Sequence, residues 1–139
     1  MTDAQAKQLA KKNAFEAMKK CVGNSYKELM MGYQKGDWKC TTQVYGPNVT
    51  ILAPGRPTVK GKDNAEKYWR ELKEQTGVTR INIKCEEMNG EGDWWFERGM
   101  YQLYKGDTIF EERKYVKVWR KWEGKFYIYS YAFNIVPKA

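Results

Sequence analysis

The chain has 139 residues, of which 42% are hydrophobic and 15% aromatic, and it carries a formal net charge of +8. This length and apolar content suit a single domain, which we expect over residues 1–139. The sequence contains no histidine, which excludes Ser-His and Cys-His nucleophilic catalysis and histidine-based zinc sites. No segment approaches the roughly 20 apolar residues of a membrane span, and the N-terminus has no signal-peptide core. We therefore expect a cytoplasmic protein.

The first part of the chain has the apolar periodicity of helices, recurring every three or four residues. The predicted helices span residues 3–22, 25–35, 37–44 and 62–75. Gly23-Asn24 separates the first two, and Gly36 and Gly77 stand where helices stop. Asp37 occupies the N-cap position of the third.

From Val78 onward the pattern changes to strands joined by short polar turns. Strands are predicted over residues 78–88, 94–104, 109–122 and 125–136, with an earlier short strand at 49–52. Helices followed by hairpin-linked strands predict an α+β domain. We expect a cone-shaped, curved antiparallel sheet wrapped around the N-terminal helices and the 62–75 helix, with an internal cavity.

The last predicted strand is apolar on both of its alternating faces. One face contains Phe126 and Ile128, and the other contains Tyr127, Tyr129, Tyr131 and Phe133. A monomer could hardly bury both rows. The prediction is that one face meets the cavity and the other meets a second copy, so that the chain forms a homodimer through the outer face of its sheet.

Four segments, in order and at fitting spacing, resemble a known fold family. They are residues 33–38, 49–61, 97–101 and 116–126. Together with the element order, they resemble the SnoaL-like and ketosteroid-isomerase-like families of the nuclear transport factor 2-like superfamily, over residues 8 to 135. The resemblance implies the cone-shaped fold and says little about chemistry, because these families include enzymes, association domains and adaptors.

The resemblance also implies where catalytic groups would stand. In isomerase-like members a carboxylate base works with a tyrosine and a protonated acid. Those positions fall here on Ala53, Leu29 and Val116, which are chemically inert. We therefore predict no catalytic residue and lean towards a non-catalytic domain. Two alternatives stay open: an isomerase, cyclase or hydratase that uses Tyr33, Arg98 and a strand glutamate, and a protein-protein adaptor with a packed interior.

Strand alternation and the resemblance together predict a cavity wall that is apolar with a few polar groups, as small-molecule pockets are. The predicted wall also includes Leu29, Ala53 and Val116. Its predicted ligand-binding residues are Tyr33, Tyr68, Trp69, Phe96, Arg98, Met100, Gln102, Tyr129, Tyr131 and Phe133. The same rings could equally fill the core without any ligand.

Arg98 is the residue that suggests a ligand class. A guanidinium in an apolar cavity must be paired, either with Glu112 or Glu111 on the neighbouring strand or with a ligand carboxylate or phosphate. The second case predicts a small apolar or amphipathic acid as ligand. By alternation Glu97 points to the opposite face from Arg98, which suggests a structural or interface role.

The remaining reactive residues give no cofactor signature. Cys21, Cys40 and Cys85 are odd in number and have no metal-ligand spacing, as expected of reduced thiols. No metal or cofactor is predicted. The lysines are interleaved with acids or lie on the solvent side of the first helix, so a nucleic-acid partner is not expected.

Overall fold

The chain begins with one long helix, α1 (Asp3–Lys35), in a computed structural model that describes residues 1–138. Thr2 and Gln5 form a capping box at its start, and Gly36 ends it in a left-handed conformation, φ 71°. The predicted break at Gly23-Asn24 is wrong. A glycine inside a helix costs only about 1 kcal/mol, and the buried face around it, including Met18, Val22 and Leu29, supplies more than that.

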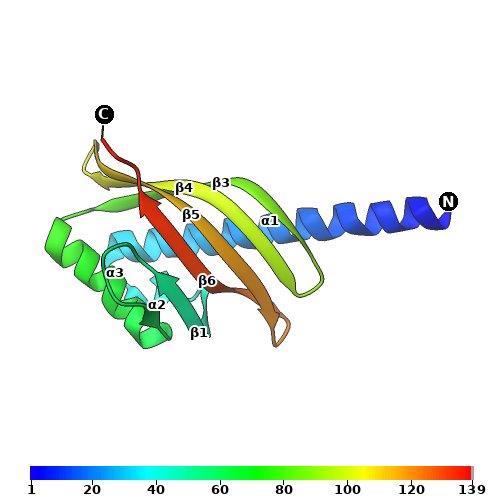
Figure 1. The fold of residues 1–139 in the computed structure, drawn as a ribbon, viewed down its shortest axis with the longest axis horizontal. Coiled ribbons are helices and arrows are strands. Elements are labelled where there is room, and N and C mark those ends of the chain that lie inside the picture. Colours follow the sequence, from blue (N-terminus) through cyan, green and yellow to red (C-terminus); the bar gives the residue numbers. More distant parts are fainter. Residues whose placement is uncertain (139) are drawn as a thin grey trace.

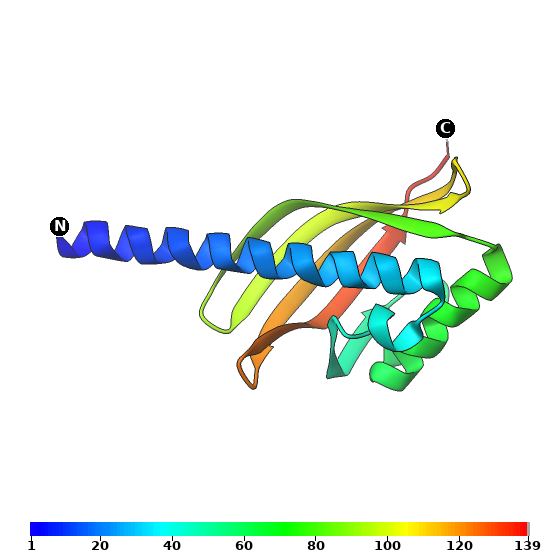
Figure 2. The ribbon, with the colours of Figure 1, turned by 180° about the vertical axis from the view of Figure 1, so that it is seen from behind.

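The N-terminal part of α1 extends well past the sheet (Figures 1 and 2). Residues 1–14 are all exposed, and the first buried residue is Met18. Only the later turns of α1 therefore contribute to the core.

Of the two other helices, α3 (Lys62–Thr76) was predicted closely, whereas α2 (Trp38–Thr41) ends three residues before the predicted end at residue 44. In α2 the Asp37 side chain accepts a hydrogen bond from the backbone N–H of Cys40 at 3.1 Å, so the predicted cap is confirmed. The next helix, α3, follows Gly61 and ends at Gly77, φ 75°. It packs its buried face, including Tyr68 and Trp69, towards the sheet.

A six-stranded sheet forms the rest of the fold, with strand order β2-β1-β6-β5-β4-β3. Its strands are β1 (Tyr45–Leu52), β2 (Val59–Lys60), β3 (Arg80–Glu91), β4 (Trp94–Lys105), β5 (Thr108–Trp122) and β6 (Lys125–Ile135). The pairing is antiparallel except between β1 and β6, which are parallel. β1 starts four residues earlier than predicted, and β2 was not predicted as a strand.

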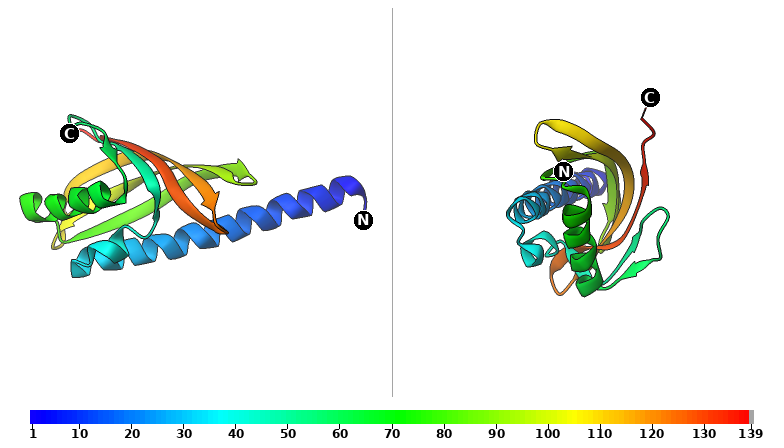
Figure 3. Two further views of the ribbon diagram at one scale, coloured as in Figure 1. Left: turned by 90° about the horizontal axis from the view of Figure 1, so that it is seen from below. Right: turned by 90° about the vertical axis from the view of Figure 1, so that its left-hand side faces the viewer.

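The sheet curves around the helices, which cover its concave face (Figure 3). This arrangement confirms the predicted α+β class and the cone-shaped sheet. Side chains on the concave side meet α1 and α3, and those on the convex side face away from them. We call these sides the inner face and the outer face.

Candidate functional site

The residues predicted to bind a ligand lie on both faces of the sheet rather than around one cavity. Five of them are buried on the inner side: Tyr33, Tyr68, Trp69, Tyr131 and Phe133. The other five lie on the outer face, half-buried or exposed: Phe96, Arg98, Met100, Gln102 and Tyr129. Of the further wall residues, Leu29 is buried, Ala53 packs against the core, and Val116 is 43% exposed.

The face assignment of β4 and β5 was therefore wrong by one residue. The inward positions are the odd-numbered ones, including Trp95, Glu97 and Tyr101 on β4, with Tyr115 and Trp119 on β5. The alternation of side chains alone could not show which row of β4 faces the helices, because both rows contain large rings. The structure buries the row whose polar groups find partners.

Arg98 does not enter the cone, and it does not pair with Glu112. Its guanidinium lies on the outer face, 3.7 Å from a carboxylate oxygen of Glu86 and 3.8 Å from one of Glu87, and the side chain is 49% exposed. Exposed ion pairs of this kind contribute at most about 1 kcal/mol. The proposed anchor for an acid inside the cone is thus absent at this position.

Glu97 takes the interior place instead, and it is completely buried. Its carboxylate accepts hydrogen bonds from the Tyr26 hydroxyl on α1, from the Tyr115 hydroxyl at 2.5 Å and from the Trp119 ring N–H at 2.9 Å. These donors come from one helix and the neighbouring strand. The carboxylate thereby ties α1 to the sheet.

Lys117 is the cation of the same cluster. It stands opposite Glu97 in the β4–β5 register and is 3% exposed. Its ammonium donates to the Tyr26 hydroxyl at 2.9 Å and lies 4.1 Å from the centre of the Tyr115 ring. Burial lowers its pKa from 10.5 to about 8, although the charge of Glu97 opposes this shift.

A second polar cluster surrounds Arg113. Its guanidinium donates to the hydroxyls of Tyr68 at 2.9 Å and Tyr101 at 3.2 Å, and it pairs with Glu111 at 2.5 Å. Tyr131 donates in turn to Tyr101. The arginine that lies inside the cone is therefore Arg113, which was not predicted there, and its partners belong to the chain itself.

The inner rings are in contact with one another. The ring of Tyr101 lies 6.0 to 6.3 Å from those of Tyr115, Tyr131 and Phe133 between ring centres, and Tyr131 stacks on Phe133 at 5.4 Å. Within residues 1–138 no buried side-chain nitrogen or oxygen lacks a hydrogen-bond partner. The buried polar side chains of this part of the chain are thus each paired within the protein.

The Cys85 thiol and the described acidic side chains also lack the features of a reactive or metal-binding site. Burial, with help from the charge of Glu97, raises the pKa of the Cys85 thiol to about 11, which keeps it protonated and weakly nucleophilic. Across residues 1–138 no cluster of three or more acidic or cysteine side chains is placed to hold a metal ion. None of the described helices combines the length and apolar character needed to cross a membrane.

The outer face has the opposite composition. An apolar group, which we call the outer patch, consists of Trp94, Val116, Trp122 and Tyr129, each 41 to 48% exposed. The rings of Trp94 and Tyr129 meet edge to face at 5.3 Å, and the Arg120 guanidinium lies 5.1 Å from the Trp94 ring centre. Large rings exposed together on a sheet are typical of a surface that a partner covers.

Comparison with known proteins bears on the fold. No family model matches the sequence, and no curated protein matches it. A nuclear transport factor 2-like protein with a cystatin-like fold from Novosphingobium aromaticivorans is similar in structure with a TM-score of 0.78, at 11% identity over 94% of this chain and 90% of that one.

Two further solved structures are similar. One is a protein of unknown function with a cystatin-like fold from Nostoc punctiforme, with a TM-score of 0.72 and 14% identity over 86% of this chain and 91% of that one. The other is a ketosteroid isomerase-like protein from Erwinia carotovora atroseptica, with a TM-score of 0.67 and 15% identity over 85% and 95%. At these identities the likeness concerns the fold, and the chain has the nuclear transport factor 2-like fold that its sequence motifs predicted.

Proposed function

We propose that this chain is a non-catalytic assembly domain that forms a two-fold symmetric dimer through its outer patch. The observation that carries the proposal is the reversal between the faces: the charged groups Glu97 and Lys117 are buried and satisfied, whereas the rings Trp94 and Tyr129 are exposed. An isolated domain would gain free energy from covering those rings.

The interior supports a structural role. A catalytic carboxylate needs a free lone pair near a substrate, and a catalytic lysine needs access to one. Glu97 already accepts three hydrogen bonds, and Lys117 is enclosed by tyrosine rings. Of the functional hypotheses that the sequence left open, a protein-protein adaptor with a packed interior agrees best with these contacts.

The outer patch supports self-association. A two-fold interface brings the same surface of both copies together, so a mainly apolar patch suits it, with the Arg120 guanidinium held against the rings of Trp94 and Tyr129. Around the patch, Phe96, Met100 and Val118 add further half-buried apolar surface. The pair formed by Arg98 with Glu86 and Glu87 lies at the side, where it would belong to a polar rim.

Sedimentation velocity on two variants that each introduce one exposed glutamate tests the proposal. Val116→Glu places a carboxylate in the outer patch, whereas Met31→Glu places one on α1 at a similar exposure, 47% against 43%. We expect wild type and Met31→Glu to sediment as dimers and Val116→Glu as a folded monomer of 16.4 kDa. A wild-type monomer at micromolar concentration, or equal behaviour of the two variants, would refute the interface.

A further inference from the structure

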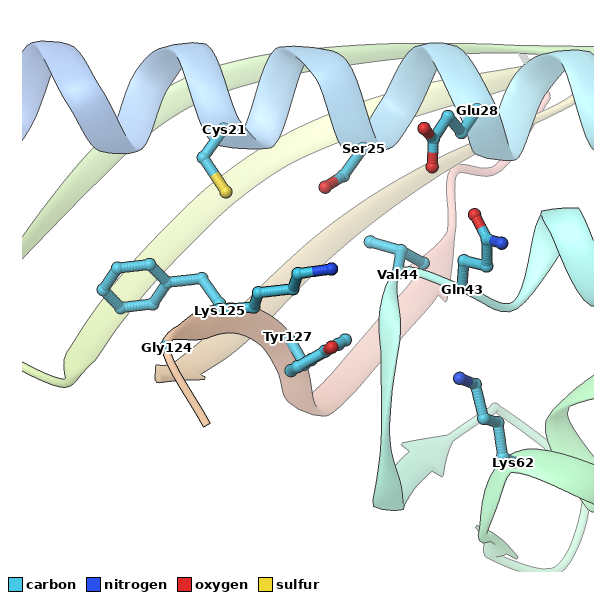
Figure 4. Close-up of a pocket in the computed structure, with 10 residues that line it drawn as sticks. Cys21, Ser25, Glu28, Gln43, Val44, Lys62, Gly124, Lys125 and Tyr127 are labelled. Carbon is cyan, nitrogen blue, oxygen red and sulfur yellow. The ribbon is translucent and has the colours of Figure 1, made fainter. Parts of the chain in front are cut away.

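A pocket of about 480 Å³ opens between α1, the start of α3 and the hairpin that joins β5 to β6 (Figure 4). Its polar lining comes from Ser25, Glu28, Gln43, Lys62, Lys125 and Tyr127. The pocket is separate from the buried clusters around Glu97 and Arg113, and none of the predicted ligand-binding residues lines it. Its volume lies in the usual range for small-molecule sites.

The charges around this pocket are unpaired. Lys62 begins α3 and Lys125 begins β6, and Glu28 on α1 is the acidic side chain of the lining. None of the three forms an ion pair with any side chain in residues 1–138. Two cations brought to one hollow from different elements, against one carboxylate, leave it with a net positive charge. Such a cleft attracts anions.

The pocket also has an apolar surface. Val44 is buried, and the rings of Phe126 and Tyr127 are half-buried. The Tyr127 ring packs edge to face against Trp122, with 6.3 Å between ring centres, which limits its movement. A ligand here would place a flat apolar body against these side chains and an anionic group near the lysines.

We propose that this pocket binds a small organic anion: a carboxylate carried on a planar apolar body, with the carboxylate between the Lys62 and Lys125 ammonium groups. Ser25 and Gln43 supply neutral hydrogen-bond donors at the α1 and α2 side of the hollow (Figure 4). Glu28 disfavours dianions and leaves room for a single negative charge. The outer patch touches the pocket wall through Trp122, which packs against Tyr127, but neither lysine belongs to the patch, so the proposal does not rest on the dimer.

Titration of ¹⁵N-labelled protein with 2-naphthoate, followed by NMR, tests the proposal. The matched control ligand is 2-naphthamide, which has the same shape without the charge. We expect naphthoate to shift the amides of residues around Ser25, Lys62 and Lys125, and to bind more tightly than the amide. Lys62→Gln and Lys125→Gln should each weaken naphthoate binding about fivefold, and roughly 25-fold together.

Two lysines outside the pocket provide the protein controls. Lys60→Gln and Lys27→Gln remove the same charge from exposed positions that do not line the hollow, and we expect both to bind naphthoate like wild type. The proposal would be overturned by equal affinity for acid and amide, or by equal effects of all four lysine substitutions. It would also be overturned by amide shifts centred on the outer patch, or by no shifts up to the solubility limit of naphthoate. Because oligomeric state is measured separately, failure here is distinguishable from failure of the dimer.

Discussion

The two faces of the β4–β5 hairpin are built from the same run of residues and differ in an instructive way. The inner face buries the charged groups of Glu97, Arg113 and Lys117, and the outer face exposes the rings of Trp94 and Trp122. Hydropathy would assign these faces the other way round. Hydrogen bonding determines which row of side chains faces the helices. A buried carboxylate that accepts three hydrogen bonds is stable, whereas an exposed ring can be buried when a partner binds.

The largest effect should come from breaking the inner carboxylate. Glu97→Ala removes the acceptor of three hydrogen bonds and leaves Lys117 as a buried charge without its counter-ion. We expect a loss of about 3–5 kcal/mol in the free energy of unfolding, measured by urea denaturation. Glu87→Ala, which removes an exposed carboxylate beside Arg98, should cost less than about 1 kcal/mol. Similar losses in the two variants would contradict the assignment of faces.

A glycine on the inner face gives the next largest effect. A methyl group at Gly99 would come within 2.3 Å of the Lys84 carbonyl oxygen and 2.5 Å of the Tyr115 hydroxyl. Gly99→Ala should therefore destabilise by about 1–3 kcal/mol. Gly23→Ala makes the same change in α1, where nothing lies within 4 Å, and should stabilise by up to about 1 kcal/mol. Thermal melts of both variants measure these effects. An unchanged melting temperature in Gly99→Ala would mean that the inner face is loosely packed.

These contrasts explain which secondary-structure elements could be predicted from the sequence. Periodicity and turn residues placed α3 and four strands closely, because local signals such as Gly77 after α3 and Gly106 between β4 and β5 determine where those elements start and stop. The continuity of α1 through Gly23 depends on tertiary packing of its buried face, which no local signal reports.

The site was harder to predict than the fold. The order of elements does not say which row of β4 faces the helices, and a one-residue shift exchanges Arg98 for Glu97. One signal was present: Glu97 and Lys117 carry opposite charges at positions that pair across the hairpin. A register-based search for such pairs among rings would have found the buried cluster.

The pH dependence of stability should report the buried lysine. The folded chain releases the Lys117 proton near pH 8, and the unfolded chain releases it near 10.5. Between these values the unfolded state binds more protons, so stability rises with pH. We expect a gain of about 1 kcal/mol from pH 8 to 9 in wild type, measured by denaturant titration, and none in Lys117→Met. Above pH 9 the raised pKa values of Cys85 and Tyr26 act in the opposite direction.

The smallest effect on folding is expected at Arg98. Arg98→Ala removes an exposed pair with Glu86 and Glu87, so the free energy of unfolding should change by less than about 1 kcal/mol. Arg113→Ala is the inner counterpart and should cost several times more, because Glu111 and two tyrosine hydroxyls lose their donor. If Arg98→Ala destabilised as strongly as Arg113→Ala in the same urea titration, the outer face would be part of the core.

The central claim, that the inner face holds the fold together and the outer face joins two copies, is tested most directly by the dependence of melting temperature on protein concentration. A dimer is stabilised by mass action, so its melting temperature rises with concentration. We expect this rise in wild type and in Glu97→Gln, which should melt at a lower temperature throughout, and no rise in Val116→Glu. A wild-type melting temperature independent of concentration, or the same rise in Val116→Glu, would contradict the account.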